Sequence, residues 1–455
     1  MGQRRFGKRW LTVLALVAAL RVMLYAGLIP PWQGPDEPKH YEYVALLDRL
    51  HRSLNPSDVN LALERQIIDS LAEFRYWEYW GRPTPEALPV NFVQIWGPSS
   101  TLLQRAPLYY VTIWPIYHVV RDLPLALQLL MLRLSGLLFF VPTIWFCWAL
   151  AKEIYPNRLD LAVGAALVVT WLPQFTAENS ILSNDALAYL IGATIAFVAV
   201  GGITRGWSLR RLLGLVILLG IGFLIKRTVV LLLPLVLVAL LLGTWTRGGL
   251  TRGVIFALLV LGGGSVALWR IPALLIRINH LALDYPTQLT EITNRSHYTA
   301  SALPLYGTYA SWLYDSFWAY LGWAARPAPS VTYQILLVVT VWAVLGALYI
   351  VLRGRIGIVR LKSTSRRAVL VCLLGVIGAA LGAMLFYSLY FNPRAVPQGR
   401  YLFPLIGPIA VVLVGGIAAL WPSRGQRWCV PVLVTLTVAF DVWYVAGFMV
   451  PYFYG

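Results

Sequence analysis

Apolar stretches of about twenty residues, separated by short polar segments, recur along almost the whole chain. A helix needs about 20 largely apolar residues to cross a bilayer, so each stretch predicts a transmembrane helix. Eleven stretches qualify, at residues 10–29, 123–150, 160–176, 186–203, 209–225, 228–244, 252–269, 331–352, 367–391, 401–420 and 428–449. The pattern therefore predicts an all-α fold, a polytopic transmembrane helical bundle of about eleven spans that forms a single domain over residues 1–455.

Two other segments are helical in pattern but poorly suited to crossing. Residues 107–120 are short and interrupted by Pro115, whereas residues 61–80 place Ile67 and Leu71 on one face of an amphipathic helix. Helices with one apolar and one polar face lie in the membrane interface. We expect interfacial juxtamembrane helices in the first outer loop, with residues 61–80 in the interface and residues 107–120 forming an interfacial or re-entrant helix.

Charge predicts the orientation of the spans. The chain has a formal net charge of +18, although only 12% of its residues are charged. If residues 107–120 do not cross, about half of the 37 Lys and Arg residues fall in the short loops on one side. By the positive-inside rule that side is cytoplasmic, so the N-terminus lies inside and the C-terminus outside a plasma membrane. The long segments 30–122 and 270–330 then lie on the outer side.

Composition narrows the function classes. A hydrophobic content of 59% and a mean hydropathy of +0.69 favour a bilayer over water as the solvent, and the basic excess belongs to loops rather than to a nucleic-acid site. The three cysteines and the scattered histidines have no metal-ligand or disulfide spacing. Residues 10–29 end in Ile-Pro-Pro-Trp instead of a small-residue cleavage site, which predicts an uncleaved first helix.

The first candidate for chemistry is the acidic pair Asp36 and Glu37, which lies between Pro35 and Pro38 just after the first span. A partly desolvated carboxylate at the outer mouth of the membrane can take a proton from an acceptor hydroxyl. Asp36 can equally be the N-cap of a helix that has Pro38 in its first turn. On this segment alone both interpretations stay open.

Further charged residues are predicted on the same outer face, at the ends of later spans. Asp185 precedes the fourth span, where a helix N-cap is the simpler interpretation. Lys226 and Arg227 lie at the outer junction of two spans, and Arg394 and Arg400 follow a later one. Extension of the side chain to the membrane interface (snorkelling) explains each arginine taken alone. Several cations on the outer side, however, run against the positive-inside rule. A phosphate partner accounts for that exception.

These motifs together resemble the GT-C superfamily, the multi-span glycosyltransferases that use polyprenyl-phosphate sugars. The resemblance is carried by Pro35-Asp36-Glu37-Pro38 with His40, by Pro107 to Tyr110, by Asp185, by Lys226, and by Gly399 to Pro404 with the sequence GRYLFP. It is strongest for bacterial membrane-protein families of this superfamily that share the patterns PDE-x-x-H and GRY-x-x-P.

The chain also departs from the better-studied members of the superfamily in two places. Arg105-Ala106-Pro107 stands where many members have His-Pro-Pro or Lys-Pro. No large soluble domain is expected after the last span, which argues against a protein sequon as acceptor.

The resemblance implies a fold and an activity. It implies an inverting transfer of a monosaccharide from a polyprenyl-phosphate carrier to a lipid, glycan or envelope-polymer acceptor at the outer membrane face. Asp36 is then the base and Glu37 the second catalytic carboxylate. The implied substrate-binding residues are His40, Arg105, Tyr109, Asp185, Lys226, Arg227, Arg400 and Tyr401. No metal site is assigned, but Asp36, Glu37 and Asp185 leave open a weakly held Mg²⁺ or Mn²⁺.

Two other classes of function need outer-face cations and aromatic surfaces as well: a transporter or flippase of lipid-linked saccharides, and a non-catalytic scaffold in polysaccharide assembly. Transporters commonly contain internal repeats and charges near the membrane midplane. The chain shows no internal repeat, and its candidate charges lie at predicted helix mouths. The pattern therefore favours a transferase.

Overall fold

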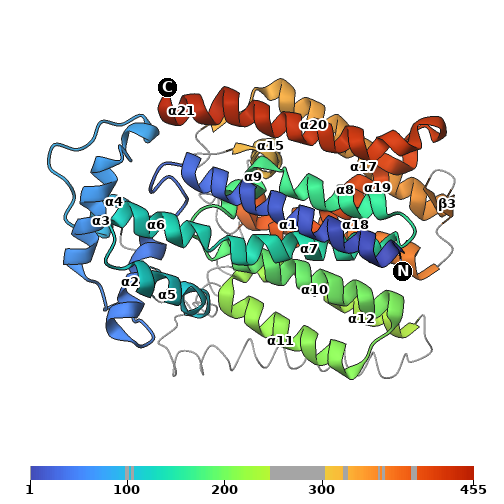
Figure 1. The fold of residues 1–455 in the computed structure, drawn as a ribbon, viewed down its shortest axis with the longest axis horizontal. Helices are drawn as coiled ribbons and strands as arrows, with labels where there is room; N and C mark the ends of the chain where they lie inside the picture. Colours follow the sequence, from blue (N-terminus) through green and yellow to red (C-terminus); the bar gives the residue numbers. More distant parts are fainter. Residues whose placement is uncertain are drawn as a thin grey trace.

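The computed structural model describes residues 2–97, 102–103, 107–245, 303–320, 326–356, 359–360, 364–390 and 397–455. Over these residues the chain is a bundle of helices (Figure 1). Its strands there are two residues long: β1 (Arg326–Pro327), β2 (Arg355–Ile356) and β3 (Val359–Arg360). The predicted all-α fold is confirmed.

The helices up to residue 245 are α1 (Gly2–Leu28), α2 (Glu37–Leu50), α3 (Leu61–Glu73), η1 (Glu78–Trp80), α4 (Phe92–Trp96), α5 (Leu108–Val120), α6 (Leu125–Leu134), α7 (Leu137–Ile154), α8 (Leu159–Thr170), α9 (Pro173–Glu178), α10 (Asp185–Arg205), α11 (Leu209–Ile225), η2 (Arg227–Leu232) and α12 (Leu233–Trp245). The later helices are α15 (Leu303–Trp318), α17 (Ser330–Arg353), α18 (Thr364–Tyr390), η4 (Gly399–Leu405), α19 (Ile406–Leu420), η5 (Ser423–Trp428), α20 (Cys429–Tyr444), the π-helix η6 (Val445–Met449) and α21 (Val450–Tyr454).

Seven stretches of the described chain are long and apolar enough to cross a membrane, and each overlaps a predicted span. They are Arg9–Leu28, Leu125–Ile154, Asp185–Arg205, Ser330–Arg353, Ser365–Phe386, Gly399–Leu420 and Ser423–Tyr454. Helix α11 and two shorter apolar helices, Leu159–Thr170 and Thr228–Gly243, correspond to three further predictions. The predicted span 252–269 lies outside the described residues, so the count of eleven stays a prediction.

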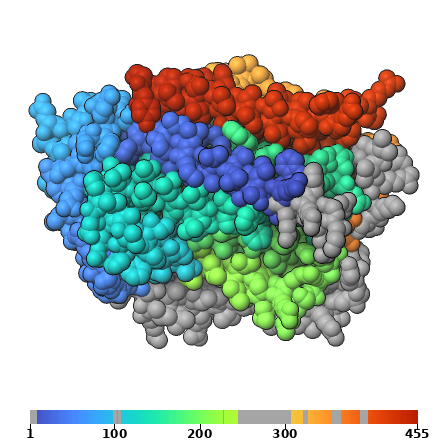
Figure 2. Space-filling model, in the orientation of Figure 1, coloured from blue at the N-terminus to red at the C-terminus, as the bar shows by residue number. Residues whose placement is uncertain are grey.

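The helices run between two ends of the bundle. Figure 1 shows α2, α3 and the C-terminus at one end, and the N-terminus with β3 at the other. The predicted topology, with an odd number of spans, likewise places the two termini at opposite ends. Figure 2 shows the C-terminal helices extending along one side of the bundle, next to α1. Which end faces the cytoplasm stays a prediction from the positive-inside rule.

A buried ion pair ties α20 to α1 inside the apolar bundle. Arg21 is paired with Asp441, and the Tyr25 hydroxyl donates to Asp441 Oδ1 at 2.7 Å. The Arg21 guanidinium also lies 4.5 Å from the centre of the Trp171 ring, at the end of α8. A charge in such surroundings is tolerated only when it is paired, so this cluster fixes three helices against one another.

The segment after α1, which is predicted to form the first outer loop, folds back on itself. Helix α3 forms where residues 61–80 predict an amphipathic helix, and its residues Leu63, Ile67, Ile68 and Leu71 are buried. Its apolar face therefore packs on protein. An interfacial helix would instead turn that face towards lipid. Helix α5 has 13 residues, fewer than the roughly 20 needed to span a bilayer.

Two carboxylates meet where α3 packs against α2. Glu42 is 1% exposed and Glu64 is 3% exposed, and Glu64 Oε2 accepts a hydrogen bond of 2.8 Å from the backbone N–H of Phe92. Burial raises the pKa of Glu42 to about 8, helped by repulsion from the Glu64 carboxylate and by a hydrogen bond that protonated Glu42 donates to it, although Lys39 opposes the rise. Glu42 is therefore protonated at neutral pH and shares its proton with Glu64.

This carboxyl pair predicts a stability that falls as the pH rises. Between the ordinary pKa of 4.5 and the folded value of about 8, folded Glu42 holds a proton that the unfolded chain has lost. Stability is then lost as the pH rises through this window. The melting temperature of the purified protein should decline from pH 5 to 9, and Glu42→Gln, which mimics the protonated acid, should flatten that decline. The exposed Glu73→Gln is the matched control and should melt with the wild-type pH profile.

Candidate active site

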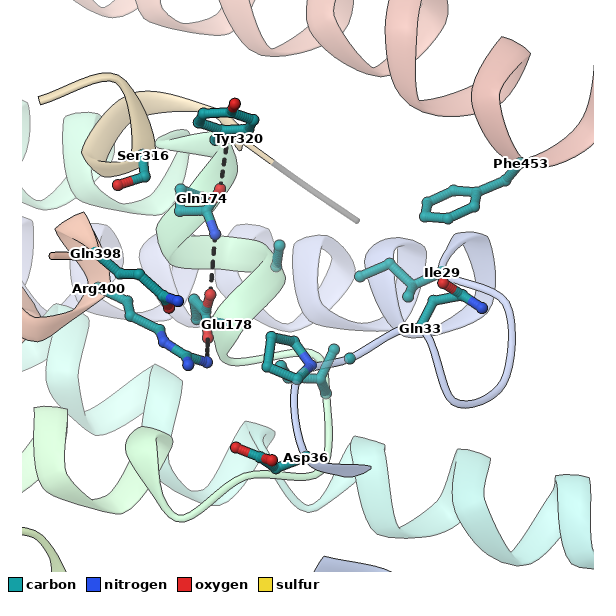
Figure 3. Close-up of a pocket in the computed structure, with 14 residues that line it drawn as sticks. Ile29, Gln33, Asp36, Gln174, Glu178, Ser316, Tyr320, Gln398, Arg400 and Phe453 are labelled. Carbon is teal, nitrogen blue, oxygen red and sulfur yellow. Dashed lines mark hydrogen bonds and ion pairs between the residues drawn. The ribbon is translucent and has the colours of Figure 1, made fainter. Parts of the chain in front are cut away.

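A cavity of about 260 Å³ lies where the loop after α1 meets α9, the end of α15 and η4 (Figure 3). Its walls come from five separate parts of the sequence: residues 29–36, 174–181, 316–320, 398–400 and 453. Its polar side chains are those of Gln33, Asp36, Gln174, Glu178, Ser316, Tyr320, Gln398 and Arg400. The fold thus brings Asp36 and Arg400, two of the predicted site residues, to one cavity.

Asp36 occupies the N-cap position of α2 but does not cap it. Its backbone is left-handed, with φ at 60°, and its side chain makes no capping hydrogen bond. Such a conformation is uncommon for a residue other than glycine and costs free energy. The carboxylate instead pairs with Lys39 Nζ at 3.0 Å and is about one-third exposed. The position predicted by the capping interpretation, with Pro38 in the first turn, is thus observed, but the side chain is not used as a cap.

The charge of Asp36 is stabilised by its neighbours. Burial alone would raise the pKa of this carboxyl, but Lys39, His40 and Arg400 together hold it below the ordinary value. Lys39 is itself placed by Trp96, whose ring centre lies 5.2 Å from Nζ. The carboxylate at the cavity wall is therefore ionised at neutral pH, so it can accept a proton or orient a hydroxyl.

Glu37 points away from the cavity and is fully buried against Arg133 of α6. Two parallel hydrogen bonds of 2.7 Å join the guanidinium to Oε1 and Oε2. Each oxygen also accepts a backbone N–H at 3.0 Å, Oε1 from Leu182 and Oε2 from Gly34. All the accepting capacity of the carboxylate is thus used within the protein.

Arg133 also fastens the end of α1. Its remaining N–H groups donate to the carbonyls of Ala26, Ile29 and Pro30, so all five guanidinium donors are used. Gly34 is required beside this pair because a Cβ there would lie 2.7 Å from the nearest Ile181 atom and closer still to Glu37. The loop that carries Asp36 is therefore held from both sides.

A chain of polar contacts crosses the cavity wall, as Figure 3 shows. Arg400 Nη1 lies 3.7 Å from Glu178 Oε2, and Gln174 Nε2 donates to Glu178 Oε1 at 2.9 Å. Gln174 Oε1 in turn accepts from the backbone N–H of Tyr320 at 2.8 Å. In the described part of the chain, neither Glu178 Oε2 nor Arg400 Nε has a hydrogen-bond partner. This leaves unused hydrogen-bonding capacity at the cavity.

Glu178 is a site residue that sequence reasoning missed. Burial raises the pKa of Glu178, Asp185 adds to the rise, and the cations Arg400 and Lys226 oppose it. The only signal in the sequence was its place seven residues before Asp185, in the same predicted outer loop.

A second ion pair lies beside the cavity. Asp185 pairs with Lys226 and accepts a hydrogen bond of 3.2 Å from the Ser183 hydroxyl. The N-cap position belongs to Asn184, so the capping role considered for Asp185 is wrong. Lys226 Nζ and the Arg400 guanidinium lie 6.0 and 5.5 Å from the centre of the Tyr401 ring. The two cations therefore both lie near one aromatic ring.

His40 and Tyr109 join α2 to α5. His40 Nδ1 is hydrogen-bonded to the Tyr110 hydroxyl at 2.9 Å, and the Tyr110 ring stacks on Tyr43 with ring centres 3.6 Å apart. The buried Tyr109 ring packs against His40 and Phe139. His40 also interacts electrostatically with Asp36 and Asp185. Both residues thus stabilise the packing of α2, the helix that follows Asp36, against α5.

The remaining candidates are not placed by the structure. Arg105 and Arg394 lie outside the described residues, and so does the side chain of Arg227. Within the described ranges, no three His, Cys, Asp or Glu side chains converge as a metal-binding group would require. Glu37 is bonded to Arg133 and Asp185 to Lys226, so these carboxylates are not poised to hold Mg²⁺ or Mn²⁺ with Asp36.

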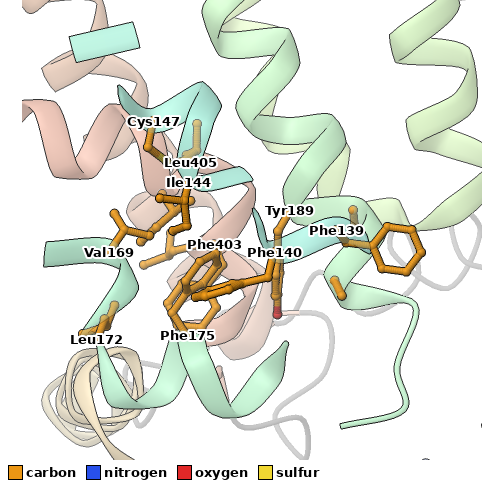
Figure 4. Close-up of a cluster of buried hydrophobic side chains, with 14 of the residues drawn as sticks. Phe139, Phe140, Ile144, Cys147, Val169, Leu172, Phe175, Tyr189, Phe403 and Leu405 are labelled. Carbon is orange, nitrogen blue, oxygen red and sulfur yellow. The ribbon is translucent and has the colours of Figure 1, made fainter. Parts of the chain in front are cut away.

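An aromatic cluster joins α9 and η4, two of the elements that wall the cavity (Figure 4). Phe175 packs on Phe140, Tyr189 and Phe403, with ring centres 5.0 to 5.5 Å apart. Gly399 lets α15 approach closely, since a Cβ there would lie 2.2 Å from the backbone nitrogen of Phe317. The Gly-Arg-Tyr motif therefore presents Arg400 from a tightly packed base.

Comparison with known proteins agrees with the predicted superfamily. Residues 104–269, a little over a third of the chain, match the family model described as dolichyl-phosphate-mannose-protein mannosyltransferase. This family is part of the GT-C superfamily, so the resemblance predicted from short motifs is confirmed. The match supports glycosyl transfer from a polyprenyl-phosphate sugar in general terms. No curated protein is similar enough to the chain to count as a match.

The Arg133–Glu37 pair predicts a large stability loss when one partner is removed. Arg133→Met leaves a buried, uncompensated carboxylate, which costs about 3–5 kcal/mol. Adding Glu37→Gln should restore part of that loss, as measured by unfolding in detergent. The control is Arg65→Met, which breaks the exposed Arg65–Asp69 pair and should cost no more than about 1 kcal/mol. Equal losses for the two single variants would contradict the assignment.

Proposed function

We propose that this protein transfers a monosaccharide, with inversion, from a polyprenyl-phosphate carrier to an acceptor hydroxyl at the outer face of the plasma membrane. The observation that carries the proposal is the meeting of Asp36 and Arg400 in one cavity, although they come from opposite ends of the sequence. A carboxylate base and cations for a leaving phosphate are the two elements that this reaction needs from the protein.

Asp36 supplies the base. The acceptor hydroxyl gives its proton to the Asp36 carboxylate while its oxygen bonds to the anomeric carbon. The bond from that carbon to the carrier phosphate breaks on the opposite face, and the phosphate leaves with the electron pair. Because the low pKa of Asp36 keeps it ionised, the base is ready at any pH near neutral.

Lys226 and Arg400, which both lie near the Tyr401 ring, bind the carrier phosphate. In the structure their partners are Asp185 and Glu178, which neutralise the two cations. The 3.7 Å separation of Arg400 from Glu178 and the unused Arg400 Nε leave room for a stronger partner. A phosphate, which accepts paired N–H bonds from a guanidinium, is such a partner. Arg105 and Arg227 remain further candidates for this role.

Glu37 and His40 have positioning roles in this scheme. Glu37 fixes the loop through Arg133, and His40 holds α5 against α2 behind Asp36. No step is assigned to a divalent cation, because Glu37 and Asp185 are already bonded to Arg133 and Lys226. The matched family's description names a mannose donor, so polyprenyl-phosphate mannose is the first donor to test.

The test of the base is Asp36→Asn, which keeps the size of the side chain and removes the proton acceptor. Carrier release from polyprenyl-phosphate mannose and other polyprenyl-phosphate sugars should fall by about 100-fold or more. The donor Kd should change by less than about tenfold, because the phosphate contacts remain. Asp69→Asn, an exposed aspartate on α3, is the control and should keep full turnover. Wild-type turnover by Asp36→Asn would refute the proposal.

The phosphate contact is tested by Arg400→Gln. Losing a charge-assisted contact should weaken binding of the phosphorylated donor by about 10- to 100-fold. Binding of the matching unphosphorylated polyprenol should not change, which separates loss of phosphate recognition from general damage. The exposed Arg424→Gln removes the same charge elsewhere and should leave donor affinity intact. An unaltered donor Kd in Arg400→Gln would move the phosphate site away from this arginine.

A further inference from the structure

One cavity side chain is buried without a partner and has no role in the reaction as described. Gln33 is 2% exposed and lines the cavity wall three residues before Asp36. Within the described part of the chain, neither its Nε2 nor its Oε1 has a hydrogen-bond partner. Its backbone is fixed by a turn in which its N–H donates to the carbonyl of Pro30 at 3.2 Å.

An unpaired buried amide is costly. Leaving a buried polar group unsatisfied costs about 1–3 kcal/mol, and native proteins avoid it unless the group has another use. The other buried amide of the cavity shows the contrast, since both ends of Gln174 are bonded, to Glu178 and to Tyr320. Gln33 therefore presents a donor and an acceptor side by side, without partners among the described residues, to a ligand in the cavity.

The surroundings of Gln33 indicate the chemistry of that ligand. Figure 3 shows Gln33, Ile29 and Phe453 at one end of the cavity, and Glu178 and Arg400 towards the other. The end with Gln33 carries no charge, and Phe453 gives it an apolar ring. A neutral amide beside an aromatic ring suits a neutral molecule with hydroxyl groups on one side and a C–H face on the other.

Phe453 is held in place by the first outer loop. The Tyr79 hydroxyl donates to the Phe453 carbonyl at 3.0 Å, and the two rings pack edge to face with centres 5.4 Å apart. The ring is 4% exposed. It therefore forms a fixed wall opposite the charged end of the cavity.

We propose that Gln33 binds two adjacent hydroxyl groups of a sugar ring whose C–H face lies towards Phe453. One hydroxyl accepts from Nε2 and the other donates to Oε1. The inference rests on the proposed function in one respect, namely which substrate carries the sugar ring. That substrate is either the donor or the acceptor. Sugar recognition by the cavity itself is independent of catalysis.

The direct test uses sugar binding and needs no turnover. Saturation-transfer NMR on the purified protein in nanodiscs should detect methyl α-D-mannopyranoside or another methyl glycoside of a hexose panel at about 10 mM. Tetrahydropyran-2-methanol, which keeps the ring and lacks its hydroxyls, should not bind. Gln33→Met, which keeps the side-chain length and removes both polar atoms, should abolish the sugar signal. Gln66→Met, at an exposed position on α3, should retain it.

Melting separates recognition from packing. Because the empty protein gains nothing from an unpaired amide, Gln33→Met without sugar should melt at or above the wild-type temperature. A role in packing alone predicts a lower melting temperature and unchanged sugar binding, which would overturn the inference. Absence of binding of every hexose glycoside by the wild-type protein would overturn it too.

Kinetics identify the substrate that carries the ring. If the wild-type protein releases carrier, Gln33→Met should raise KM by about 10- to 30-fold for that substrate, the donor or the acceptor, as loss of two neutral hydrogen bonds requires. Unchanged KM for both, in an active enzyme, would defeat the inference and leave the proposed function standing. Sugar binding that depends on Gln33 in a protein without transferase activity would defeat the proposed function alone.

Discussion

The buried contact between Arg133 and Glu37 is the interaction on which the site depends. One guanidinium uses all five donors, two on the carboxylate and three on the carbonyls that end α1. The end of the first helix, the loop after it and the start of α2 are thereby fixed as one unit. Asp36 lies in that loop with a left-handed backbone, a conformation that persists only where the surroundings impose it.

The apolar surroundings of the helices explain why the other buried charges are paired. Arg21, Lys226 and Arg400 lie on or next to apolar helices, and each is paired with a carboxylate from a distant part of the sequence. Arg21 and Asp441 make close contact deep in the bundle and serve structure. Arg400 and Glu178, at a cavity, stand 3.7 Å apart with hydrogen-bonding atoms unused. Both pairs leave a buried atom of each partner without a hydrogen bond in the described part of the chain, but only Arg400 and Glu178 line a cavity where a ligand can reach those atoms.

Sequence patterns predicted the apolar helices and the segments that carry Asp36, Asp185, Lys226 and Arg400, because hydrophobicity and charge bias depend on local composition. They did not predict partners, which depend on contacts between distant segments. Arg133 sits within a predicted span and resembles any snorkelling arginine until its five bonds are seen. Helix α3 is a second example. The spacing of its apolar residues is the same whether lipid or protein covers them, so the sequence did not predict which one does.

The cavity wall is drawn only partly from the segment that matches the family. Residues 104–269 include Asp185, Lys226 and Glu178, whereas Arg400, which pairs with Glu178, lies outside the match. Gln33, Asp36 and Phe453 lie outside the match, at positions that contact the ring or the attacking hydroxyl in the proposed reaction. Function resides in the site and not in the fold. In the proposed reaction, the match therefore covers part of the carrier-binding set, and the residues proposed for the base and for the sugar ring lie outside it.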